Sequence, residues 1–119
     1  MLQALSGPGL LIHAAGPSEP DTLAGILRSA ANARAALKPG AAIEVVVQGP
    51  GVRLLTADSP VNEAITQTRQ LNVVILACAN SMRSAGLEAE DLSAGICTVP
   101  AAVAHLAERQ WQGWAYVRP

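Results

Sequence analysis

A chain of 119 residues fits one domain, and it is long enough to bury a core without a metal or a disulfide. Half of its residues are hydrophobic, mostly Ala, Val, Leu and Ile, which suits helices packed closely on a sheet. The formal net charge of -1 offers no basic surface for a polyanion, which argues against nucleic acid as a partner.

The first predicted elements are a buried strand and an amphipathic helix. The run from residue 10 to residue 15 is apolar except for His13, which is typical of a strand buried on both faces of a parallel sheet. Ser18 and Asp21 have the spacing of a capping box. Apolar residues then recur at helical spacing, which predicts a helix after this capping box. The helix is expected to end at Lys38, where Pro and Gly follow.

A second strand and a second helix come next. Residues 43–47 are β-branched at four of five positions, which predicts a strand, and residues 52–55 predict a short extended piece. Ser59 followed by Pro60 predicts the start of a helix, with Ser as the N-cap and Pro in the first position.

The C-terminal half continues the alternation. Residues 73–77 predict a third strand, followed by a short helix that begins near Cys78. Residues 96–99 predict a fourth strand and residues 115–117 a terminal one. Between these two strands, Pro100 opens a helix whose inner side is expected to carry Val103, Leu106, Ala107 and Gln110. The alternating order predicts a layered α/β domain over residues 1–119, with helices on both faces of the sheet.

The chain shows the features of a cytoplasmic protein. No Lys or Arg precedes the first apolar run, so that run is not a signal peptide, and no stretch of 18 apolar residues predicts a membrane span. Cys78 and Cys97 are not closely spaced, and we expect both to be reduced thiols. Charged residues make up only 14% of the chain, so we expect other subunits to cover part of its apolar surface.

Four segments are expected at one edge of the sheet, because ligands of open parallel sheets bind beyond the carboxyl ends of the strands. They are His13, residues 48–51, residues 78–81 and residues 99–100. Cys78 is the leading candidate, since a thiol at the start of a helix has a lowered pKa and reacts as the thiolate. The alternative is a small buried hydrophobe without chemistry.

Three other residues are candidates to support Cys78. Asn80 and Ser81 lie in the same turn and are expected either to donate hydrogen bonds to a bound group or to cap the helix. His13 either forms a Cys–His pair with Cys78 or is held by a backbone hydrogen bond.

The remaining polar motifs predict no cofactor and no metal. The segment Gly49-Pro50-Gly51 lacks the Lys of a P-loop and the spacing of a dinucleotide fingerprint, and it is interpreted as a turn. The two His and two Cys residues are too widely spaced for a zinc pattern. His105 is predicted on the solvent face of the last helix, and Cys97 in the core. Flavin is disfavoured because the edge loops lack aromatic residues.

In its order of motifs the chain resembles the DsrE/DsrF-like proteins, also called YchN-like, which are associated with sulfur metabolism. The resemblance rests on four stretches over almost the whole chain: Leu11-Ile12-His13, residues 43–52, Ala77-Cys78-Ala79-Asn80-Ser81-Met82 with Gly86-Leu87, and Val99-Pro100-Ala101 with residues 113–119. The third stretch looks like the branch of the family with a Cys-x-Asn-Ser/Thr-Met motif.

The resemblance implies a three-layer flavodoxin-like sandwich with a mostly parallel five-stranded sheet, assembled into trimers or hexamers. It also implies that Cys78 accepts sulfane sulfur as a persulfide, in a sulfur-relay or sulfur-sensing role with a donor or acceptor protein and no external cofactor. A second reading stays open, in which the protein is a small-ligand-binding or scaffold module of the same fold with an inert Cys78.

Overall fold

Five parallel strands form the centre of the structure, a computed structural model that describes residues 7–119. They are β1 (Leu10–Ala15), β2 (Ile43–Gln48), β3 (Val74–Cys78), β4 (Cys97–Val99) and β5 (Ala115–Val117). Their order in the sheet is β4-β3-β2-β1-β5, and all four pairings are parallel. Each predicted strand is confirmed with bounds that differ by one residue at most.

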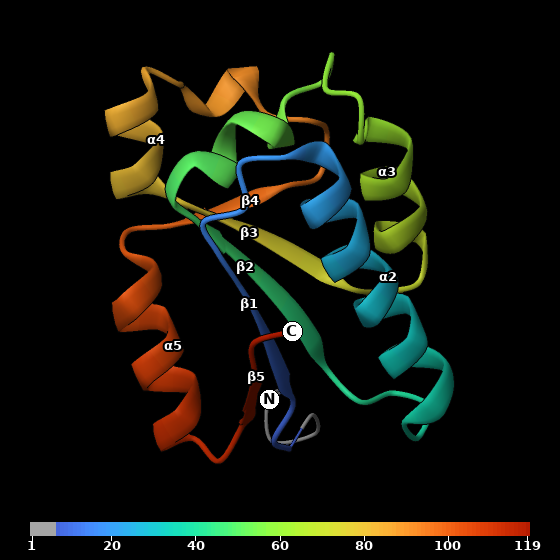
Figure 1. The fold of residues 1–119 in the computed structure, drawn as a ribbon. Helices are drawn as coiled ribbons and strands as arrows, with labels where there is room; N and C mark the ends of the chain where they lie inside the picture. Colours follow the sequence, from blue (N-terminus) through green and yellow to red (C-terminus); the bar gives the residue numbers. More distant parts are fainter. Residues whose placement is uncertain (1–6) are drawn as a thin grey trace.

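Helices cover both faces of this sheet, as predicted. They are α2 (Pro20–Ala36), α3 (Asn62–Gln70), α4 (Ala79–Ala85) and α5 (Ala102–Trp111), with two 3₁₀-helices, η1 (Gly49–Leu55) and η2 (Ala89–Asp91). Figure 1 shows α2 and α3 on one side of the sheet and α5 on the other. Parallel crossovers are right-handed, so the connection that returns from β4 to β5 at the far edge lies on the opposite face. Among the described helices, none is long and apolar enough to cross a membrane.

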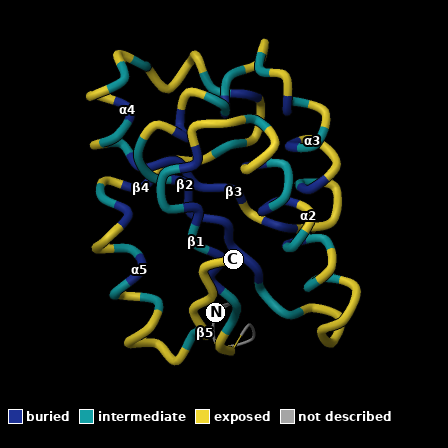
Figure 2. The backbone as a smooth tube through the Cα atoms, viewed as in Figure 1, coloured by how far each residue is buried: buried dark blue, intermediate teal, exposed yellow. Residues whose placement is uncertain are grey.

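The sheet separates two apolar cores of unequal size. The larger core lies on the side of α2 and α3, and the smaller one lies under α5. Figure 2 shows the buried residues concentrated along the central strands. The smaller core consists of Leu11, Val46, Leu76, Cys78, Val99, Ala102 and Leu106, with Trp114 packed against it. Cys78 therefore lies on the α5 face of the sheet, which sets the direction from which its sulfur is reached.

Two helix starts differ from the prediction. The first is at α2, where Glu19 is the N-cap, without a side-chain hydrogen bond, and Pro20 takes the first helical position. Ser18 lies one residue too early to act as the cap. The second is at α3, which begins at Asn62, because Ser59 and Pro60 form a turn before it. In that turn the Ser59 Oγ accepts a hydrogen bond from the Val61 N–H at 3.2 Å.

The segment after β2 is also different, because residues 52–55 are part of the 3₁₀-helix η1 and not an extended piece. Pro50 suits the first turn of a helix, where its missing N–H costs nothing. Gly51 packs so closely that an added Cβ would lie 2.8 Å from the Pro17 carbonyl oxygen. This close contact fixes η1 against the loop that follows β1.

The face that α5 turns towards the sheet was predicted incorrectly. Leu106 is buried as expected, but Val103 is 69% exposed and Gln110 is exposed. His105, predicted on the solvent face, instead turns towards the sheet and contacts Glu44 of β2. A charged partner on a sheet strand, and not the apolar pattern of the helix alone, determines which side of α5 faces inward.

Candidate functional site

Cys78 lies at the junction of β3 and α4. It is the last residue of the strand and also the N-cap of the helix, with an extended backbone. It is 3% exposed. The predicted position, directly after the third strand at a helix start, is confirmed.

The sulfur of Cys78 lies at the N-terminal ends of two helices. The backbone N–H of Ala102, the first residue of α5, donates a hydrogen bond to the Cys78 Sγ at 3.4 Å. On the α4 side, the Ser81 hydroxyl and the N–H groups of Ser81 and Asn80 also favour the charged thiolate. Free N–H groups at helix N-termini carry partial positive charge, so both helices stabilise an anion at this sulfur.

These donors determine the charge state that the Cys78 thiol prefers. Burial alone raises the pKa of the thiol, because it penalises the charged form. The Ser81 hydroxyl and the N–H groups of Ala102, Ser81 and Asn80 outweigh that effect, and the pKa lies below its ordinary value. The environment thus favours the nucleophilic form of the cysteine.

Ser81 is itself held in place by the loop after β2. Its Oγ accepts a hydrogen bond from the Gly49 N–H at 2.8 Å, which leaves the hydroxyl proton free to point at the sulfur. Gly49 has a φ of +75°, and an added Cβ would lie 3.3 Å from the Cα of Gly16. Only glycine fits this position without strain, so the turn predicted at Gly49 has a specific role in the site.

His13 does not pair with Cys78 in the structure. Its Nε2 lies 2.8 Å from the Oε1 of Gln48, and its Nδ1 lies 2.6 Å from the hydroxyl oxygen of Tyr116. Because Oε1 only accepts, Nε2 carries a proton in its contact with Gln48. The partners of His13 are therefore side chains of the neighbouring strands, and not the backbone group that the sequence favoured.

The His13 group nevertheless lies beside the cysteine. Val47 pairs with Ala77, so Gln48 is level with Cys78 on the adjacent strand, and alternation places both on the α5 face. A row of polar side chains thus runs from Cys78 through Gln48 and His13 to Tyr116, on β3, β2, β1 and β5. Cys78 and Gln48 are the last residues of their strands, as expected, and Tyr116 of β5 adds an unpredicted hydroxyl beside His13.

The other candidate residues have simpler places. The Oδ1 of Asn80 accepts a hydrogen bond from the guanidinium of Arg83 within α4, so its side chain is occupied on the helix surface. Cys97 was predicted in the core but is exposed. It lies on β4, a strand of three residues at the edge of the sheet.

A small cleft adjoins the site on the side of η1 and α4. Its volume is about 200 Å³, and it is lined by Gly49, Pro50, Arg53, Ser81, Ser84 and Ala85. Ser81 is thus shared between the cleft and the environment of the Cys78 sulfur.

Sequence reasoning found most of this site but missed Ala102 and Tyr116. Ala102 contributes only a backbone N–H, and the role of such a group cannot be predicted from the residue type. Pro100, two residues earlier, was expected at the edge. Tyr116 lies on the terminal strand, whose pairing with β1 brings its hydroxyl to His13. The hydroxyl of Tyr116, in a predicted strand, was the only feature of the sequence that could have indicated this contact.

Comparisons with known proteins agree with this fold. The model of the DsrE/DsrF-like family matches residues 15–119. Protein MTH1491 of unknown function from Methanobacterium thermoautotrophicum is 29% identical, with a TM-score of 0.86 over 94% of this chain and 99% of its own. Curated proteins give no match.

Two more distant structures share the fold. The YchN protein of E. coli is 13% identical, with a TM-score of 0.75 over 94% of this chain and 99% of its own. Protein BT1422 from Bacteroides thetaiotaomicron is 21% identical, with a TM-score of 0.74 over 100% of this chain and 99% of its own. The three-layer flavodoxin-like arrangement is thereby confirmed. The family match spans most of the sequence, and the chain belongs to the DsrE/DsrF-like family.

Proposed function

We propose that this protein carries sulfane sulfur as a persulfide on Cys78, in a sulfur-relay or sulfur-sensing role in the cytoplasm. The observation that carries the proposal is the hydrogen bond from the Ala102 N–H of α5 to the Cys78 sulfur, which also lies at the start of α4. The Ser81 hydroxyl and the N–H groups of α4 act in the same direction, because they lower the pKa of the thiol against the effect of burial. Membership of a family associated with sulfur relay supports the same chemistry.

The chemistry needs only the thiolate and a persulfide donor. The Cys78 thiolate attacks the outer sulfur of a donor R–S–SH, a new S–S bond forms on Cys78, and the donor S–S bond breaks. The donor leaves as the thiolate R–S⁻, so the sulfur moves without a net oxidant, reductant or cofactor. An acceptor thiolate then takes the sulfur by the same step in reverse: it attacks the outer sulfur of the Cys78 persulfide, and Cys78 leaves as its thiolate. The N–H and O–H groups that favour the Cys78 thiolate therefore assist both loading and release.

The deciding experiment is intact-mass spectrometry after treatment with a small persulfide donor. We expect the Cys97→Ser variant to gain about 32 Da, the mass of one sulfur atom, and the adduct to map to Cys78. The Cys78→Ser variant, which keeps the exposed Cys97, is the matched control and should gain no comparable adduct. Uptake by Cys97 alone, or no uptake by either variant, contradicts the proposal.

One observation favours a second function. Because Cys78 is 3% exposed, a donor reaches its sulfur only if the start of α5 or α4 shifts. A binding or scaffold module with an inert Cys78 needs no such opening. Failure of a small alkylating reagent to modify Cys78 in the folded protein, at a pH where it modifies Cys97, supports this second function.

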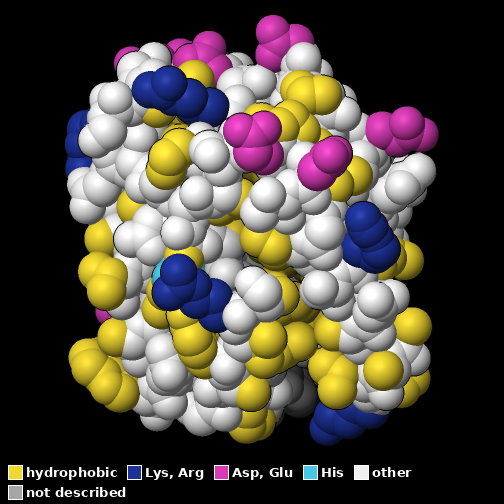
Figure 3. Space-filling model, viewed as in Figure 1, with side chains coloured by type: hydrophobic (Ala, Val, Ile, Leu, Met, Phe, Trp, Pro, Cys, Tyr) yellow, Lys and Arg dark blue, Asp and Glu magenta, His cyan; other side chains and the backbone are white. Residues whose placement is uncertain are grey.

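We also propose that the chain forms a homo-oligomer, a trimer or a hexamer. Support comes from large apolar side chains exposed on the protomer, among them Trp111 at 82%, with Val103, Tyr116 and Val117. Figure 3 shows hydrophobic side chains spread over the lower half of one face, while acidic side chains gather mainly at its upper edge. Exposed apolar area on this scale is typical of a surface that a partner covers.

The assembly is tested by sedimentation velocity at low micromolar concentration. We expect a species of three or six chains, and we expect Trp111→Glu to shift the protein towards the monomer by placing charge in the apolar surface. The control is Leu37→Glu, which places the same charge on an exposed leucine at the C-cap of α2, on the other side of the sheet from α5. A monomer at all concentrations contradicts the proposed assembly.

A further inference from the structure

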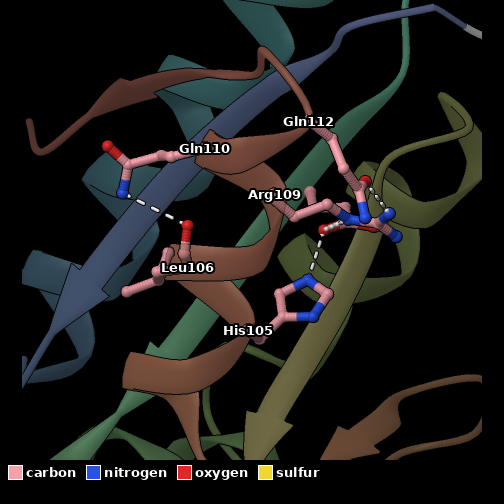
Figure 4. Close-up of polar contacts among 6 residues, drawn as sticks. His105, Leu106, Arg109, Gln110 and Gln112 are labelled. Atoms are coloured by element: carbon pink, nitrogen blue, oxygen red, sulfur yellow. Dashed lines mark hydrogen bonds and ion pairs between the residues drawn. The ribbon is translucent and has the colours of Figure 1, made fainter.

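A buried carboxylate on β2 holds the helix that contacts Cys78. The Glu44 side chain is 8% exposed and lies among the apolar residues of the sheet. His105 Nε2 donates to its Oε1 at 2.6 Å, and Arg109 donates to both oxygens, from Nε at 3.2 Å and from Nη2 at 2.7 Å. Figure 4 shows His105 and Arg109 projecting from one face of α5 towards the same carboxylate.

This cluster and the Cys78 contact lie on one face of α5. Ala102, His105 and Arg109 are spaced by three and four residues, so they share the side of the helix that faces the sheet. The rise from Ala102 to Arg109 is about 10 Å along the helix. On β2, the distance from Glu44 to the level of Cys78 is about 13 Å. The helix therefore spans the sheet between the carboxylate and the sulfur.

Apolar packing alone does little to fix α5. Its two buried residues are Ala102, whose side chain is a single methyl group, and Leu106. A helix that makes few apolar contacts, with small side chains among them, can slide or rotate on a sheet. A forked guanidinium and an imidazole on one buried carboxylate define a single position, because each donor has a fixed direction. The Arg109 guanidinium is further held over the Trp114 ring, 4.6 Å from its centre.

We infer that Glu44, His105 and Arg109 are positioning residues, which hold α5 so that the Ala102 N–H reaches the Cys78 sulfur. The inference deepens the proposed function, on which it rests, by linking a cluster at the amino ends of the strands to the thiol at their carboxyl ends. It also explains why Glu44 lies between Ile43 and Val45 in a buried stretch of β2. A purely structural role for the cluster predicts a loss of stability and nothing more.

The test measures the thiolate of Cys78 directly, by absorbance at about 240 nm against pH in the Cys97→Ser background. In Arg109→Leu the midpoint of the titration should move to higher pH. The Ala102 amide should exchange with solvent about tenfold faster. Arg34→Leu is the matched control, because Arg34 also makes three hydrogen bonds, to the carbonyls of Ala41, Leu71 and Asn72, but does not contact α5. Its midpoint should stay unchanged.

Milder variants keep the test decisive if Arg109→Leu fails to fold. Arg109→Lys retains the charge without the fork, and His105→Leu removes one donor of three, so both should shift the midpoint less but in the same direction. An unchanged midpoint in a folded Arg109 variant overturns the inference, even if Cys78 takes up sulfur. Conversely, a shifted midpoint without sulfur uptake leaves the inference intact and removes the proposed function.

Discussion

Replacing Ile75 by alanine should lower the free energy of unfolding by about 2–5 kcal/mol, the range for truncating a large aliphatic side chain in a packed core. Ile75 is fully buried in β3, in the larger core beneath α2 and α3. Its loss leaves a cavity that the surrounding strands and helices fill only in part. Urea denaturation monitored by circular dichroism measures the change.

Val74 provides the matched control, because it is the neighbouring residue on the same strand and is 44% exposed. Val74→Ala should cost about 1 kcal/mol or less, since it removes little buried area and changes mainly strand propensity. Equal losses for the two variants would contradict the described face of β3, and with it the placement of Cys78 under α5.

Replacing Ser81 by alanine should slow sulfur uptake at pH 7 by about tenfold, because a hydrogen bond to a charged acceptor is lost. The Ser81 hydroxyl lowers the pKa of the Cys78 thiol, so its removal raises that pKa and leaves less thiolate at neutral pH. A lowered pKa favours the folded state above the pH at which the unfolded thiol titrates. That contribution disappears as the pH falls through the folded pKa, and in Ser81→Ala it is smaller.

Ser84→Ala is the control for this variant. Ser84 lies on the same short helix and lines the same cleft, but it is not among the groups that affect the Cys78 thiol. Its uptake rate should equal that of the parent protein. If Ser81→Ala and Ser84→Ala react alike, the hydroxyl of Ser81 has no part in stabilising the thiolate.

The sequence predicted the strands because their signals are local. Residues 10–15 and 43–47 are apolar except for His13 and Glu44, which suits strands buried on both faces, and their bounds are correct to within one residue. The rule that ligand sites lie at the carboxyl ends of parallel strands also placed Cys78, Ser81, Gly49 and His13 at one edge.

The errors arose where distant residues decide the structure. Glu44 is 61 residues from His105 and 65 from Arg109, so no local pattern on α5 reveals which side faces the sheet. Cys97 was predicted in the core because it lies in a predicted strand of mostly apolar residues. However, β4 is an edge strand and leaves Cys97 exposed. The contact of the Ala102 N–H with Cys78 is equally invisible in sequence, since every residue except proline has that group.

The measurement that tests the central claim most directly is the pH titration of the Cys78 thiolate in the folded Cys97→Ser protein. Stabilisation by the ends of α4 and α5 predicts a midpoint below the value for free cysteine, about 8.5, and a higher midpoint in Ser81→Ala. A midpoint at or above the free value, unchanged by Ser81→Ala, would show that burial dominates. Cys78 would then be an inert core thiol, and the sulfur-carrier proposal would fail.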